Sequence, residues 1–117
     1  MSNEDINRNR LLEPGTWYNV EITKIYDELS KKGDSTNTMV DMKVLDGPYT
    51  GAMLFRTFNE KAPGFVIPFL KAFSIDVVAD EEYDLAALDG KQLRVFVKHR
   101  EYQGTLYNDV ADFRPIE

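Results

Sequence analysis

The sequence predicts a mainly β domain with five antiparallel strands and one helix between the third and fourth strands. Three observations lead to this prediction. Apolar and polar residues alternate through most of the chain, which is typical of half-buried strands. Residues 63–75 change to helical spacing, and turns that contain glycine separate the alternating runs. The length of 117 residues is that of a single domain.

The first two strands form the start of the predicted sheet. The first begins at Thr16, and its inner side carries Tyr18, Val20 and Ile22. Its alternation breaks at Lys24, which predicts a β-bulge that lets a long strand bend. A turn-rich loop over residues 30–34 then leads to a second strand over residues 37–45.

A third strand is predicted over residues 52–59, and it follows the second so closely that the two form an antiparallel hairpin. The sequence leaves its facing open. Met53 and Phe55 compete with Leu54 and Phe58 for the core, since either pair has the alternation of a buried face.

The rest of the chain supplies a helix and two more strands. A helix is predicted over residues 67–74 with Pro68 in its first turn, and a second helical turn is predicted around Leu85 and Leu88. Strands follow over residues 92–99 and 105–113. This is the element order of a five-stranded OB-type barrel with a helix between strands 3 and 4. We therefore expect a flexible N-terminal arm over residues 1–13 and a single OB-fold domain over residues 14–117.

Composition argues against an enzyme. The chain has no cysteine and one histidine, so the sequence indicates no thiolate zinc site, no cysteine nucleophile and no other cofactor or metal. His99 has no serine nucleophile in a recognisable turn nearby, and no glycine-rich phosphate loop occurs. The polar start and the lack of a long apolar run predict a soluble, cytoplasmic protein with no membrane segment.

The net charge of −6 is unevenly distributed. Residues 76–89 hold six acidic residues and no basic one, so the other residues carry equal numbers of acids and bases. A locally positive face is therefore compatible with the acidic total, and a nucleic-acid partner is not excluded.

The predicted fourth strand has two faces of opposite character. Leu93, Val95, Val97 and His99 fall on one face, and Arg94, Phe96, Lys98 and Arg100 fall on the other. An aromatic ring between cations on an exposed row can stack on a base while the cations meet phosphates. The alternative is a solvated strand whose half-exposed Phe96 is covered by a loop or a partner subunit.

Other aromatic and basic residues fall near the same predicted groove. Tyr102 and Tyr107 flank the last hairpin turn, the first hairpin loop carries two lysines, and Lys43 and Arg56 point outward if Met53 and Phe55 are core. Trp17 has the outward parity of the first strand, although it can equally pack under the arm or the acidic segment. The candidate DNA-binding residues are therefore Trp17, Lys31, Lys32, Lys43, Arg56, Arg94, Phe96, Lys98, Arg100, Tyr102 and Tyr107.

Four segments carry a resemblance to a known family: GTWYNVEI, VLDGPYTGAMLF, LDGKQLRVFVK and YNDVADFRP. Over residues 14–115 the chain resembles a family of small, largely uncharacterised phage proteins that look like single-stranded DNA-binding proteins. The resemblance implies a protein that coats and protects single-stranded DNA during replication or recombination, in the host cytoplasm. The partner it implies is single-stranded DNA. Replication or recombination proteins, and further copies of the chain in a homo-oligomer, are additional candidate partners.

A second function remains open from the sequence. The same face, with Phe96, Tyr102 and Tyr107, also suits an OB-type adaptor that binds a host or phage protein and no nucleic acid. A positive groove favours DNA, whereas an apolar patch ringed by mixed charges favours a protein partner.

Overall fold

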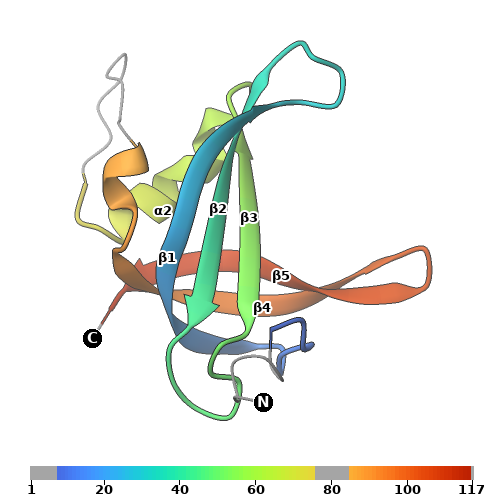
Figure 1. Ribbon diagram of the computed structural model, residues 1–117, viewed down its shortest axis with the longest axis vertical. Coiled ribbons are helices and arrows are strands. Elements are labelled where there is room, and N and C mark those ends of the chain that lie inside the picture. Colours follow the sequence, from blue (N-terminus) through green and yellow to red (C-terminus); the bar gives the residue numbers. More distant parts are fainter. Residues whose placement is uncertain (1–7, 76–84, 117) are drawn as a thin grey trace.

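Five antiparallel strands form one sheet in the order β3-β2-β1-β4-β5 (Figure 1). The computed structural model describes residues 8–75 and 85–116. The strands are β1 (Thr16–Leu29), β2 (Thr36–Val44), β3 (Met53–Asn59), β4 (Gln92–Tyr102) and β5 (Thr105–Pro115). The prediction of a mainly β chain with five strands is therefore confirmed.

The long strand β1 joins the two halves of the sheet. Val20 pairs with Val44 of β2 on one side and with Leu93 of β4 on the other. A register shift between Ile22 and Lys24 confirms the predicted bulge. Because β1 bends there, β4 and β5 cross the direction of β2 and β3 at a steep angle (Figure 1).

The core fills the concave side of the bent sheet. Leu93, Val95 and Val97 of β4 are fully buried, as their alternation predicts. They pack with buried residues of the other strands, among them Val20, Ile22, Val40, Met42, Leu54 and Val110. The facing of β4 is thus set by the apolar half of its alternating pattern.

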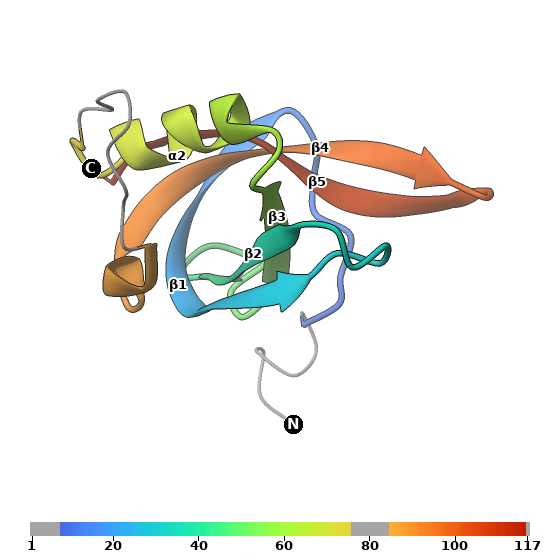
Figure 2. The same cartoon turned by 90° about the horizontal axis from the view of Figure 1, so that it is seen from above.

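One short helix lies between β3 and β4, as predicted, and covers one side of the sheet (Figure 2). A 3₁₀ turn, η1 (Pro63–Val66), leads into α2 (Ile67–Lys71), and Phe69 of α2 is buried against Phe58 and Phe113. The helix is shorter than the predicted 67–74, since Ser74 adopts a left-handed φ of 60° that ends it. The predicted second turn is η2 (Leu85–Leu88). Most of the predicted acidic stretch, residues 76–84, lies outside the described residues.

The structure decides the facing of β3. Leu54 and Phe58 are buried, whereas Phe55 is 58% exposed on the outer face. Arg56 therefore has the parity of the core, and the expectation that it points outward is wrong. Its guanidinium lies 5.0 Å from the centre of the Phe58 ring, and its Nε is shielded from solvent without a hydrogen-bond partner.

The sheet is not closed into a barrel, and its edges are β3 and β5. The described part of the N-terminal arm bridges these edges. The main-chain N–H of Met53 in β3 donates to the carbonyl of Arg8, and the N–H of Leu12 donates to Oδ1 of Asn108 in β5. The arm was expected to be flexible, but residues 8–13 are held here because Leu12 is buried in the core; residues 1–7 lie outside the described residues.

Candidate nucleic-acid interface

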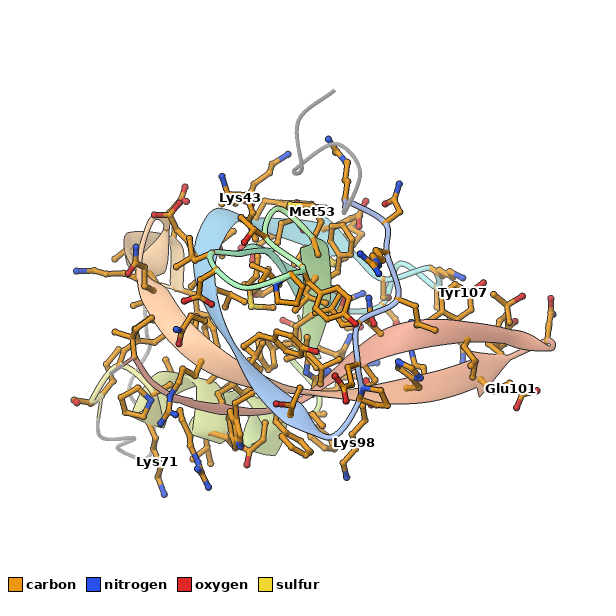
Figure 3. The ribbon with its side chains drawn as sticks, turned by 90° about the horizontal axis from the view of Figure 1, so that it is seen from below. Lys43, Met53, Lys71, Lys98, Glu101 and Tyr107 are labelled. Atoms are coloured by element: carbon orange, nitrogen blue, oxygen red, sulfur yellow. The ribbon has the colours of Figure 1, made fainter. Side chains whose placement is uncertain are left out.

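A groove of about 420 Å³ lies between β3 and the hairpin of β4 and β5, and we call it the hairpin groove. Met53 and Phe55 line it from β3, and Arg100 and Tyr107 line it from the hairpin. Residues of the arm, including Leu11, complete the lining. Figure 3 shows Met53 and Tyr107 on the same side of the molecule, with the arm running beside them.

Two exposed aromatic rings belong to the hairpin groove. Phe55 is 58% exposed because it stands on the outer face of β3, and Tyr107 is 43% exposed because the hairpin extends beyond the rest of the sheet (Figure 1). Water-exposed rings of this size are uncommon outside binding surfaces when they gather in one place. The groove therefore offers two apolar faces to a flat ligand.

A cation accompanies the rings. The guanidinium of Arg100 lies 5.4 Å from the centre of the Tyr107 ring, a cation–π arrangement between register partners of β4 and β5. Lys43 is the register partner of Met53, so it flanks the groove from β2. Tyr102 is exposed near the end of the hairpin. Of the predicted DNA-binding residues, Arg100 and Tyr107 thus line this groove, and Arg56 does not.

The loop between β1 and β2 carries Lys31 and Lys32, which are both exposed. In Figure 1 this loop stands at the top of the molecule, whereas the end of the β4–β5 hairpin extends to the right. The loop is fastened by Asp34, whose carboxylate accepts hydrogen bonds from Lys61 at 2.9 Å and from Ser30 at 3.1 Å. The hydrogen bond from the Lys61 ammonium is the main reason why the pKa of Asp34 lies below its ordinary value, and the hydrogen bond from Ser30 lowers it further.

A second group of aromatic and basic side chains lies on the outer face of β1, β4 and β5. The rings of Trp17 and Phe96, which are register partners, have centres 5.3 Å apart. The guanidinium of Arg114 lies 4.3 Å from the Trp17 ring, that of Arg94 lies 5.9 Å from it, and the Lys98 ammonium lies 5.9 Å from the Phe96 ring. We call these five residues the Trp17 cluster.

The predicted row on β4 is thus divided between two surfaces. Phe96 belongs to the Trp17 cluster, whereas Arg100 lines the hairpin groove. Lys98 and Tyr107 project from opposite sides of the hairpin (Figure 3). Two features account for the division: two-stranded ribbons twist strongly, and the register between β4 and β5 shifts after Phe96.

The candidate residues did not include several members of these surfaces, among them Phe55, Arg114 and Leu106. Phe55 was missed because the alternation of β3 was ambiguous. Arg114 was missed because it joins the Trp17 cluster through the register of β5, in which it pairs with Arg94. That register cannot be predicted from the residues next to Arg114. Leu106, exposed at the edge of the hairpin groove, was missed because a lone leucine beside a turn carries no signal.

Within residues 8–75 and 85–116, no three acidic or histidine side chains gather as they would around a metal ion. None of the helices in those residues is long and apolar enough to cross a membrane. No protein-family model matches the chain, and a search of curated proteins finds no match either.

Proposed function

We propose that the protein is an OB-type single-stranded DNA-binding protein that coats and protects DNA during phage replication or recombination. The strand order β3-β2-β1-β4-β5 and the helix between β3 and β4 support an OB-type fold. OB folds bind oligonucleotides across strands 2 and 3, between the loop that joins strands 1 and 2 and the loop that joins strands 4 and 5. The resemblance of residues 14–115 to small phage proteins supports the biological setting.

One observation carries the proposal. The exposed rings of Phe55 and Tyr107 line one groove together with the guanidinium of Arg100. Rings of this kind stack on unpaired bases whatever the sequence, and a neighbouring cation neutralises the backbone phosphates. Affinity would therefore come from stacking and charge rather than from reading base edges.

The charge of the described residues is compatible with this partner. All 14 lysine and arginine residues lie in residues 8–116, whereas eight of the 20 acidic residues lie in residues 1–7, 76–84 and 117. Basic residues therefore slightly outnumber acidic ones in the described part, despite the acidic total. Lys31, Lys32 and Lys43 would meet phosphates on either side of the stacked bases.

A protein-binding adaptor is the second candidate, and the rim of the groove favours it. Leu11 and Leu106 are exposed beside the two rings, and an apolar patch of this kind also fits a protein partner. The two functions differ in salt dependence, since an apolar contact responds weakly to salt and phosphate contacts respond strongly.

Aromatic substitutions test the proposed function. Phe55→Ala and Tyr107→Ala should each weaken poly-dT binding by about 1 to 3 kcal/mol, the range for one stacked base. Phe65→Ala is the matched control, because Phe65 is 65% exposed but belongs to η1 and does not line the groove. Fluorescence anisotropy of labelled poly-dT measures all three. Normal binding by both groove variants would refute the site.

A further inference from the structure

We propose that the Trp17 cluster is a second contact for the same DNA strand, which leaves the hairpin groove, passes Lys98 and continues over the outer face of β1, β4 and β5. This inference rests on the proposed function, since it extends the binding path beyond the groove. The inference assigns a ligand to the Trp17 cluster, which lies outside the hairpin groove. That ligand is the sugar–phosphate backbone of the strand together with its bases.

The two surfaces are joined along β4. Arg100 lines the groove and Phe96 belongs to the cluster, and the two residues are four positions, or about 13 Å, apart along the strand. Lys98 stands between them with an exposed side chain. A strand leaving the groove therefore meets one more cation before it reaches the Trp17 and Phe96 rings.

The charges of the cluster point to an anion. Arg94 and Arg114 are directly opposite each other in the register of β4 and β5, and like charges in that position destabilise a sheet. In the described part of the chain, neither Arg114 nor Lys98 forms an ion pair. Phosphates placed over Arg114 and Lys98 would neutralise their charges.

Two carboxylates, those of Asp109 and Asp112, lie opposite residues of the cluster in the register of β4 and β5. Asp112 is the register partner of Phe96, but its Oδ1 accepts a hydrogen bond from the main-chain N–H of Phe113 at 2.8 Å. Asp109 is the register partner of Lys98, and the two side chains do not form a salt bridge. Near Arg114 and Lys98, one of these two carboxylates is thus engaged by the main chain and the other forms no salt bridge with Lys98.

The composition of the cluster favours nucleic acid over a second copy of the chain. Protein interfaces are enriched in aromatic residues and arginine, but charged residues as a whole are depleted at their centre, and three of the five residues of the cluster are cations. Here cations lie against the faces of both rings, with Arg114 only 4.3 Å from Trp17. Interfaces with DNA are, in contrast, polar and strongly positive, and arginine stacked on an aromatic ring is one of their common elements.

Trp17 provides a direct readout because it is the only tryptophan in the chain and lies outside the hairpin groove. The experiment adds dT oligonucleotides of increasing length and follows two signals: anisotropy of the labelled DNA and fluorescence of Trp17. OB folds occupy about 4 to 16 nucleotides. Oligonucleotides of about 4 nucleotides should raise the anisotropy and leave Trp17 unchanged, whereas those of about 12 or more should also quench Trp17.

Variants separate the two contacts. Arg114→Gln and Lys98→Gln should each lower the affinity for the long oligonucleotide several-fold and leave the affinity for the short one unchanged. Lys71→Gln is the control, because Lys71 is an exposed cation on α2 that belongs to neither surface. Equal losses for short and long DNA would overturn the inference.

Other outcomes are equally decisive. Binding at every length without any change in Trp17 fluorescence would overturn the second contact and leave the proposed function standing. A Trp17 signal that depends on protein concentration in the absence of DNA would assign the cluster to a second copy of the chain and overturn the inference. No anisotropy change at any length would refute both proposals.

Discussion

The main-chain N–H of Leu12 donates a hydrogen bond to Oδ1 of Asn108 at 2.8 Å, and this bond ties the N-terminal arm to β5. The amide nitrogen of Asn108 in turn donates to the carbonyl of Arg10, and Nε2 of His99 lies 2.6 Å from the carbonyl of Leu12. Leu12 is 1% exposed, although its neighbour Leu11 is 39% exposed. The arm therefore supplies a core residue between the two edges of the sheet.

Leu12→Ala should destabilise the protein by about 2 to 5 kcal/mol, because it removes a buried side chain and leaves a cavity. Leu11→Ala changes the same residue type one position earlier, where the residue is 39% exposed, and should change stability much less than Leu12→Ala does. Urea unfolding followed by circular dichroism measures both. Equal effects of the two substitutions would show that the arm does not contribute to the core.

Strand β4 illustrates what the sequence can predict. Its aliphatic residues occupy every second position from Leu93 to Val97, and only Phe96 on the other face is apolar, so only one facing buries Leu93, Val95 and Val97. The bulge in β1 could also be predicted, because a single polar residue, Lys24, breaks the alternation there. The facing of β4 and the bulge in β1 could thus be predicted because each depends on a pattern within its own strand.

The features that could not be predicted depend on contacts between distant parts of the chain. Both faces of β3 carry apolar residues, so its facing depends on what packs against Leu54 and Phe58. Leu12 is buried because the arm lies between the sheet edges β3 and β5, which are far from it in the sequence. The division of the β4 row depends on the twist of the hairpin, and Arg114 reaches Trp17 only through the register of β5.

Val95→Asp should prevent folding. Val95 is fully buried in the centre of β4, and an unpaired carboxylate there costs several kcal/mol, which is comparable with the whole stability of a small domain. Gln92→Asp, at an exposed position of the same strand, is the control and should fold normally. Circular dichroism and thermal melting provide the measurement. An unchanged melting curve for Val95→Asp would mean that the faces of β4 are assigned the wrong way round.

The Asp34–Lys61 ion pair should give the protein a small dependence of stability on acid pH. The pKa of Asp34 is lowered in the folded state, chiefly by Lys61, so its contribution to stability is present above the ordinary aspartate value of about 3.9. That contribution is lost as the pH falls through the folded-state pKa. The difference in melting temperature between the native protein and Lys61→Gln should therefore shrink between about pH 5 and pH 2.

An NMR titration of the Asp34 carboxyl checks the cause directly. Its pKa should rise toward the ordinary value in Lys61→Gln and stay unchanged in Lys71→Gln, where the altered cation lies on α2. If Lys61→Gln left the pKa of Asp34 where it was, the ion pair would not be what fastens the loop that carries Lys31 and Lys32.

The central claim is that the protein binds single-stranded DNA, and the most direct measurement is fluorescence anisotropy with labelled poly-dT and with duplex of equal length over a range of salt concentrations. The claim predicts much tighter binding to poly-dT, because stacking needs unpaired bases. With about three to five phosphates contacted, log affinity should fall against log salt with a slope of about −2 to −3.5. Equal affinity for the two DNAs, or binding that does not respond to salt, would contradict it.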